Sequence, residues 1–415
     1  MANKITNEQL NQMCNNAKSY GFRPERLLLL DQRLEEWSKS DMTPSIAVKI
    51  LRHGQEIFEG AYGIKGPEHG EGSLTSDTIF PICSITKPVI STLLAIMQEE
   101  GLVDLNHPVR QYIPEFTGDT NNEVRIWHLL THTSGIIDDD QDKNFGKYVK
   151  ETLGLELPED EAPDEIWDEA MLKIRDKMGS AKMEAGDRMR HDTFMKVCLS
   201  VAPTHKPQKV MQYCNTGYHL AKEIIDRLSG LPIDEYAGKK LFGPLKMSDS
   251  HFIFPKEKLS RYVTRGDEFV GSKWLNQHVL NSDSGPGGLK STVHDMTRFG
   301  QMYLNQGKLG SEVILSPYSI REITSDHNQK LAAAVYEGET FDSTWGLGWN
   351  VRGRKKDDSG MIRSAGSYEH GGFGCCKLYC DPEADVVAAY FTVCKTDTYY
   401  KSSNFFNMVL GALVD

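Results

Sequence analysis

The chain has 415 residues, 39% hydrophobic and 25% charged, which is enough apolar material for a large core and excludes a disordered or fibrous protein. Its net charge of −11 repels a phosphate backbone and disfavours nucleic acid as a partner. The longest apolar run, Val386 to Val393, is too short to span a membrane, and the N-terminus lacks an apolar stretch of the signal-peptide type. We therefore expect a cytoplasmic protein without a membrane partner.

The first predicted elements are a hairpin and a helix. Residues 45–63 alternate apolar and polar side chains around His53-Gly54, which predicts two strands joined by a short turn. Over residues 84–100 the apolar repeat changes to three and four, and Gly101 follows, which predicts a buried amphipathic helix. Further along the chain we expect helices at 126–130, 216–229 and 293–305, strands at 377–380 and 385–393, and a closing helix near 404–413.

Strands at both ends of the chain with helices between them indicate an α+β fold. We expect residues 1–115 and 290–415 to form one discontinuous α/β domain with a central antiparallel sheet, and residues 116–289 to form a mostly helical domain. The stretch 138–207 is dense in Asp, Glu and Lys and is interpreted as a surface insertion. It is either a solvated helical decoration or a lid or wall for a substrate pocket.

Cysteine and histidine patterns give little support for a metal site. The eight cysteines are irregularly spaced and form no Cys-x-x-Cys pair, so we expect free thiols. Cys375, Cys376 and Cys380 fall in a strand-like stretch, where packing as small apolar groups is favoured over zinc binding. His128 and His132 stand four apart, but no Glu follows His128 and no third ligand can be named, which favours a packed, hydrogen-bonded pair. No metal or cofactor is expected.

The sequence lacks a Gly-x-Ser-x-Gly elbow, a P-loop and a dinucleotide fingerprint. The remaining candidate for a catalytic motif is Ser84-Ile85-Thr86-Lys87. It opens the first predicted helix, so Ser84 and Lys87 share one face. A serine hydroxyl needs a neighbouring base to become a nucleophile. A lysine can serve only if its pKa falls well below about 10.4, which burial favours. The alternative is a helix-capping serine with a surface lysine one turn on.

Two further motifs carry candidate side chains. Tyr213-Cys214-Asn215 lies between a Pro-rich loop and an amphipathic helix, and a phenolate beside a cationic lysine can accept a serine proton. A second Tyr-x-Asn, at Tyr303, lies inside a predicted helix and is interpreted as core. The third motif, 370–374, begins with a histidine that can donate to a substrate carboxylate or carbonyl. Its alternative is a glycine-rich hairpin with an incidental histidine.

The order Ser-x-x-Lys, Tyr-x-Asn, His-Gly-Gly resembles the serine β-lactamase and penicillin-binding-protein superfamily. It is most similar to the class C β-lactamase-related branch, which includes family VIII esterases, D-amino-acid peptidases and acyltransferases. The resemblance implies a β-lactamase/transpeptidase-like fold, with an antiparallel sheet flanked by helices, a mostly helical domain, and the active site between them. Flanking stretches that share the resemblance are 129–135, 243–250, 287–292 and 345–349.

The resemblance also implies roles for individual residues. His370 takes the position where β-lactamases and peptidases of this group carry the Lys of Lys-Thr-Gly, which argues against β-lactamase activity and for esterase-like or transacylase activity. The implied roles are nucleophile for Ser84, general base and acid for Lys87 and Tyr213, orientation of lysine and substrate for Asn215, substrate binding for His370, Gly371 and Gly372, and an oxyanion hole from the backbone N–H groups of Ser84 and Phe373.

We therefore expect a serine hydrolase of the esterase type that acts through an acyl-enzyme on a small-molecule ester or amide. The alternatives are a D-amino-acid peptidase, an acyltransferase, and a sensor module that is acylated without turnover. The expected partner is a small-molecule acyl substrate, with no nucleic acid and no membrane. The natural substrate, the acyl acceptor and the oligomeric state are left open by the sequence.

Overall fold

The computed structural model describes residues 15–39, 43–66, 72–159, 164–177, 197–264, 282–329, 331–334, 340–357, 359–394 and 400–414, with the single residues 162, 195 and 280. Among these residues, no helix has both the length and the apolar character needed to cross a membrane. The described cysteines are buried and free, as expected, and Cys14 lies outside the described residues.

The main sheet is antiparallel and has six strands in the order β10-β11-β12-β13-β1-β2. The predicted hairpin at 45–63 is confirmed, and both C-terminal strands lie within a residue or two of their predicted positions. Strand β1 pairs with β13, so the first and last long strands of the chain are neighbours. The strands are β1 (Ser45–Arg52), β2 (Gln55–Gly63), β10 (Asn350–Val351), β11 (Tyr368–Gly372), β12 (Cys376–Asp381) and β13 (Val386–Thr392).

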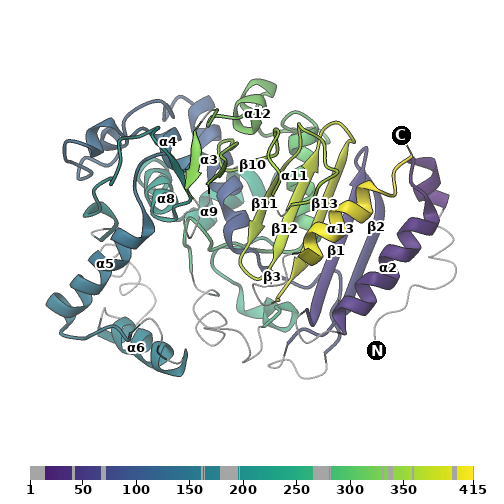
Figure 1. Cartoon of the computed structure of the whole chain (residues 1–415), viewed down its shortest axis with the longest axis horizontal. Helices are drawn as coiled ribbons and strands as arrows, with labels where there is room; N and C mark the ends of the chain where they lie inside the picture. Colours follow the sequence, from purple (N-terminus) through teal and green to yellow (C-terminus); the bar gives the residue numbers. More distant parts are fainter. Residues whose placement is uncertain are drawn as a thin grey trace.

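Strand β13 is apolar from Val386 to Phe391 because both faces of the sheet are covered. The even-numbered residues from Val386 to Tyr390 pack in a cluster with α2 (Pro24–Ser38) and α13 (Tyr400–Leu410). The odd-numbered residues from Val387 to Phe391 belong to the larger cluster on the opposite face. Figure 1 shows α2 and α13 together beside one face of the sheet. Helix α2 is absent from the sequence prediction, and α13 begins earlier than predicted.

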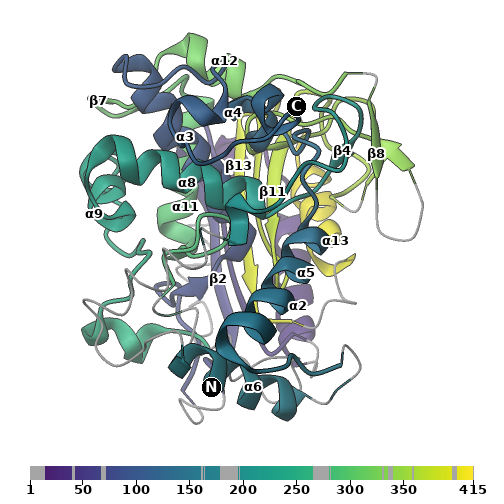
Figure 2. The same cartoon turned by 90° about the vertical axis from the view of Figure 1, so that its left-hand side faces the viewer.

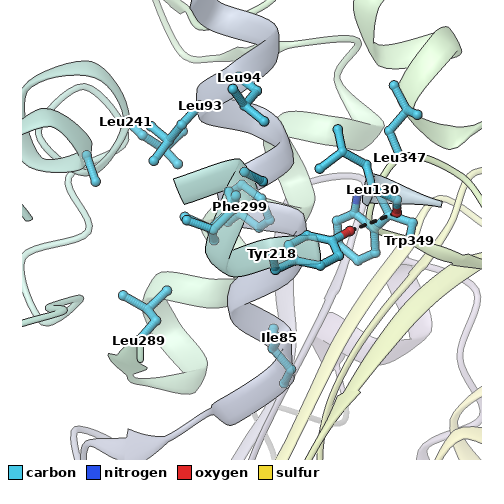
Figure 3. Close-up of a cluster of buried hydrophobic side chains, with 14 of the residues drawn as sticks. Ile85, Leu93, Leu94, Leu130, Tyr218, Leu241, Leu289, Phe299, Leu347 and Trp349 are labelled. Carbon is cyan, nitrogen blue, oxygen red and sulfur yellow. Dashed lines mark hydrogen bonds between the residues drawn. The ribbon is translucent and has the colours of Figure 1, made fainter. Parts of the chain in front are cut away.

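The opposite face of the sheet is covered by α11 (Val293–Leu304), which contacts β1, β12 and β13. Beyond it lie α3 (Thr86–Glu99), α4 (Ile126–Leu130) and α8 (Thr216–Ser229), whose positions agree with the predicted helices. Their apolar side chains contribute to the core drawn in Figure 3, where the hydroxyl of Tyr218 donates to the carbonyl of Leu130 at 2.8 Å. Tyr303 is fully buried, which confirms that it belongs to the core.

The described part of the expected insertion contains the α-helices α5 (Asp138–Tyr148) and α6 (Asp164–Lys177). Helix α5 buries none of its residues. Together with α6 it lies at the left of Figure 1, away from the sheet, and α5 faces the viewer in front of the sheet in Figure 2. The division into a discontinuous sheet domain and a helical domain stays a prediction. The remaining elements are short: β3 (Phe80–Pro81), β4 (Met211–Gln212), β5 (Lys290–Ser291), β6 (Lys308–Leu309), β7 (Glu312–Val313), β8 (Ala332–Ala334), β9 (Thr340–Asp342), α9 (Ile233–Ala237) and α12 (Pro317–Thr324), with 3-10 turns at Cys83–Ile85, Val109–Gln111, Asn121–Glu123 and Lys256–Arg261 and π turns at Val149–Leu153 and Gly238–Phe242.

Candidate active site

Ser84 lies in a 3-10 turn that leads directly into α3, two residues before the α-helix begins. The preceding residue, Cys83, has a φ of 47°, a left-handed conformation that costs a residue with a side chain on the order of 1–3 kcal/mol. Thr86 holds this turn, because its hydroxyl donates to the Cys83 carbonyl at 2.6 Å and accepts the backbone N–H of Leu289 at 3.1 Å. The strain is thus located beside the candidate nucleophile, which is itself partly exposed.

Lys87, the second residue of α3, is fully buried, and its side-chain nitrogen lies 3.0 Å from Ser84 Oγ. Its other two partners are the side-chain oxygen of Asn215 at 2.9 Å and the carbonyl of Pro286 at 3.1 Å. Both of these oxygens can only accept hydrogen bonds. A neutral Lys87 amine therefore directs its two N–H bonds to Asn215 and Pro286 and is left with a lone pair for the Ser84 hydroxyl.

The environment of Lys87 favours that neutral form. Burial lowers the pKa of Lys87 to about 7, although the carboxylate of Asp138 acts in the opposite direction. At neutral pH a large fraction of the amine is consequently unprotonated, which the sequence argument required of a lysine base. The alternative of a surface lysine beside a capping serine is wrong.

Tyr213 and Asn215 reach the same place from the segment before α8. The nitrogen of Lys87 lies over the face of the Tyr213 ring, 4.6 Å from its centroid, an arrangement that stabilises the ammonium once a proton arrives. Tyr213 and Asn215 are both partly exposed, so each is open to a molecule that contacts Ser84. The structure thus brings together four residues that the sequence motifs named: Ser84, Lys87, Tyr213 and Asn215.

Asp138 is a site residue that the sequence analysis placed only at the start of the insertion. Its carboxylate accepts the backbone N–H of Asn215 at 2.9 and 2.8 Å, and the backbone N–H and hydroxyl of Thr216 at 3.0 and 2.9 Å. The thiol of Cys214 donates to it as well, at 3.2 Å. A carboxylate at a helix N-terminus satisfies backbone donors that the helix cannot. Asp138 therefore fixes the segment that carries Tyr213 and Asn215.

Strand β11 brings the third motif against the serine turn. A side-chain carbon added to Gly372 would lie 2.1 Å from the carbonyl oxygen of Ile82, so only glycine allows this approach. His370, two residues earlier, is buried, and its ring centroid lies 6.4 Å from that of Tyr213. Phe373 follows the strand with a side chain that is 41% exposed, and the pairing of its backbone N–H with that of Ser84 in an oxyanion hole stays a prediction.

Two aromatic residues beside Tyr213 were not assigned to the site from the sequence. The ring of His132 stacks on that of Tyr213 with centroids 4.3 Å apart, and Trp345 lies edge-on to both at 5.1 and 6.1 Å. Both residues lie in stretches that share the family resemblance, 129–135 and 345–349. That resemblance was the feature of the sequence from which they could have been assigned to the site. Tyr213 is thus held by packing on several sides.

His128 and His132 each accept a backbone N–H, His128 from Arg125 and His132 from Cys214, both at 3.0 Å. These contacts agree with the predicted packed pair. In the part of the chain that the structure describes, no group of three or more His, Cys, Asp or Glu side chains is arranged to hold a metal ion.

Comparisons with known proteins identify the family and the fold. The Beta-lactamase family model matches residues 30–408. A beta-lactamase of Yersinia enterocolitica is 23% identical over 329 residues, which are 78% of this chain and 69% of the relative. Two solved structures share the fold. A penicillin-binding protein homolog from Caulobacter crescentus aligns with a TM-score of 0.68 and 17% identity, over 95% of this chain and 99% of its own. A family VIII carboxylesterase aligns with a TM-score of 0.65 and 15% identity, over 94% and 97%.

Proposed function

The chain belongs to the beta-lactamase family, as the order of its motifs indicated, and we propose that it is a serine hydrolase that cleaves a small-molecule ester through an acyl-enzyme on Ser84. One observation carries the proposal. The buried Lys87 amine lies 3.0 Å from Ser84 Oγ, while its other two contacts are oxygens that only accept hydrogen bonds. A lone pair aimed at a serine hydroxyl is the arrangement that general-base activation of a nucleophile requires.

The proposed reaction assigns the proton transfers to Lys87 and Tyr213. Lys87 takes the proton of Ser84 as Oγ bonds to the ester carbonyl carbon, and the carbonyl electron pair moves to the oxygen. When that pair returns, the bond to the alcohol breaks, and the alcohol leaves with a proton passed from Lys87 through Tyr213. Water then attacks the acyl carbon and gives a proton to the same pair. The bond between that carbon and Ser84 Oγ breaks, the pair returns the proton to Oγ, and the acid is released.

An ester is favoured over a carboxylate-bearing lactam because the His370 position lacks a cation. Burial and the nearby charge of Lys87 lower the pKa of His370 to about 3, so its imidazole is neutral at physiological pH. A neutral ring offers a substrate carboxylate none of the charge that a lysine provides. The cytoplasmic location stays a prediction.

The test compares wild type with Ser84→Ala, using hydrolysis of p-nitrophenyl acetate and intact-mass measurement of the protein. We expect wild type to hydrolyse the ester through a transient acetyl adduct, and Ser84→Ala to show neither hydrolysis nor adduct. Ser311→Ala, a substitution at an exposed serine, is the matched control and should behave as wild type. Hydrolysis by Ser84→Ala at the wild-type rate would contradict the proposal.

The same measurement separates the alternatives. A stable acetyl adduct without turnover would indicate a sensor module, whereas transfer of the acetyl group to an added alcohol or amine in preference to water would indicate an acyltransferase. Cleavage of D-amino-acid amides faster than esters would indicate a peptidase.

A further inference from the structure

The imidazole of His370 is held in one tautomer by its own strand. Its Nδ1 lies 2.7 Å from the backbone carbonyl oxygen of Gly371, and a carbonyl oxygen can only accept a hydrogen bond. Nδ1 therefore carries the ring proton. Burial is the largest cause that lowers the pKa of this ring, so the ring is neutral and Nε2 has a lone pair and no hydrogen. His370 thus presents an acceptor, the reverse of the donor role expected from the sequence.

That acceptor has no partner in the described part of the chain. His370 is 3% exposed, and its Nε2 is buried without a hydrogen bond. Leaving a buried polar atom unpaired costs on the order of 1–3 kcal/mol, so such an atom beside a reactive serine is a candidate for contact with substrate.

The rings around His370 add hydrogen-bond donors to this acceptor. His132 accepts the Cys214 N–H at Nδ1, so its own proton is on Nε2, which is buried and has no partner among the described residues. The indole N–H of Trp345 is also buried and has no hydrogen-bond partner among the described residues. The centroid of the Trp345 ring lies 5.8 Å from that of His370 and 5.1 Å from that of His132. This aromatic group, formed by His132, Tyr213, Trp345 and His370, therefore combines one unpaired acceptor with two unpaired donors.

This aromatic group adjoins the partly exposed residues of the candidate active site. Tyr213 contacts both Lys87 and His370, and Gly371 and Ser84 are partly exposed. Gly372 packs its backbone against the carbonyl of Ile82, in the turn that carries Ser84. Both Ser84 and Gly371, the residue next to His370, are therefore open to a molecule bound at this site.

We propose that His370 Nε2 accepts a hydrogen bond from an uncharged N–H or O–H group of the substrate, so that the enzyme selects esters bearing a secondary amide or hydroxyl and disfavours esters bearing a carboxylate. A secondary amide fits the aromatic group best, because it donates through N–H and accepts through its carbonyl. A carboxylate only accepts, and it would face the lone pair of Nε2. This inference rests on the proposed esterase function and specifies its substrate class.

The experiment compares matched esters that differ in one hydrogen-bond donor. p-Nitrophenyl N-acetylglycinate has an amide N–H, p-nitrophenyl N-acetylsarcosinate replaces it by N-methyl, and p-nitrophenyl hemisuccinate carries a carboxylate. A second matched pair carries the amide on the alcohol part of the ester: 2-acetamidoethyl acetate has the N–H group, and its analogue has N-methyl instead. The release of acetic acid measures the hydrolysis of this second pair. Every kcat/KM is divided by the value of the same protein on p-nitrophenyl acetate. We expect wild type to prefer the N–H ester of at least one pair by about tenfold or more, and to disfavour the hemisuccinate more strongly.

Two substitutions assign the preference to His370. His370→Phe keeps an aromatic ring but removes the acceptor, and should bring the N–H to N-methyl ratio close to one. His370→Lys supplies a cation, and should shift the preference toward the hemisuccinate by tenfold or more; circular dichroism checks that each variant is folded. Equal rates for both members of both pairs in wild type, or an unchanged ratio in a folded His370→Phe, would overturn the inference. Absence of Ser84-dependent hydrolysis of p-nitrophenyl acetate would instead contradict the proposed function itself.

Discussion

The carboxylate of Asp138 accepts the backbone N–H of Asn215 with both of its oxygens, at 2.9 and 2.8 Å. This contact joins the first residue of α5 to the segment that contacts Lys87. It also brings a negative charge close enough to Lys87 to oppose the effect of burial on the pKa of that amine. Asp138 is thereby in a position to affect both the geometry and the protonation of the proposed base.

The first prediction concerns the pH dependence of the wild-type enzyme. Lys87 must be neutral to accept the Ser84 proton, and its pKa is lowered to about 7, so kcat/KM should rise with pH and level off above that value. Well below pH 7 the rate should fall about tenfold per pH unit, because the neutral fraction does. Stopped-flow or steady-state hydrolysis of p-nitrophenyl acetate from pH 5 to 9 measures this limb. A rate independent of pH across that interval would exclude Lys87 as the base.

The second prediction concerns Asp138→Asn. The carboxylate raises the pKa of Lys87, so its removal should lower that pKa and move the ascending limb of the pH profile to lower pH. The maximal rate should also fall, since the Asn215 and Thr216 donors lose a charged acceptor. Asp139→Asn, in the same helical turn but exposed, removes the same charge away from these contacts and is the control. Identical profiles for both variants would contradict a specific role for Asp138.

The third prediction is that Tyr213→Phe lowers kcat by about two orders of magnitude or more, a typical loss when a proton-transfer group is removed. The ring contacts with His132 and Trp345 are retained by phenylalanine, so the melting temperature should change little. The control is Tyr318→Phe, at a side chain that is 76% exposed. Nearly normal turnover by Tyr213→Phe would remove this phenol from the mechanism.

The fourth prediction compares two adjacent glycines of β11. Gly372→Ala would place a carbon 2.1 Å from the Ile82 carbonyl oxygen and must move the strand away from the serine turn. A displacement of this size at the reacting groups should reduce kcat/KM about a hundredfold. In Gly371→Ala the closest contact is 3.7 Å, an ordinary packing distance, so the loss should be much smaller. Equal losses in the two variants would show that the approach of β11 to Ile82 is unimportant.

The fifth prediction concerns stability. Gly348 has a φ of 85°, and an added carbon would lie 2.4 Å from Ser91 Oγ in α3. Gly348→Ala should therefore lower the free energy of unfolding by roughly 3 kcal/mol, through backbone strain and overpacking together. Gly101→Ala meets only the strain of a φ of 75°, with no atom within 4 Å, and should cost about 1 kcal/mol. Urea unfolding of both variants measures the difference, and equal losses would contradict the packing argument.

Local patterns in the sequence predicted the elements that repeat regularly. The alternation at 45–63 and the apolar repeat at 84–100 correspond to β1, β2 and α3, because side-chain period alone separates strand from helix. The helix α2 was missed, although its buried residues Leu27, Leu30 and Leu34 follow a helical period. The sequence also predicted that Ser84 and Lys87 lie close together, because a spacing of three residues corresponds to about one helical turn.

What the sequence by itself determined is the family to which the chain belongs and the candidates for the reacting groups. Only the tertiary structure decided the protonation states of these groups, because a pKa depends on burial and on neighbours that are distant in the chain. Lys87 loses basicity through burial, and its hydrogen-bond partners Asn215 and Pro286 lie more than 100 residues away. The acceptor character of His370 Nε2 likewise follows from the orientation of the neighbouring carbonyl, which no spacing of residues specifies.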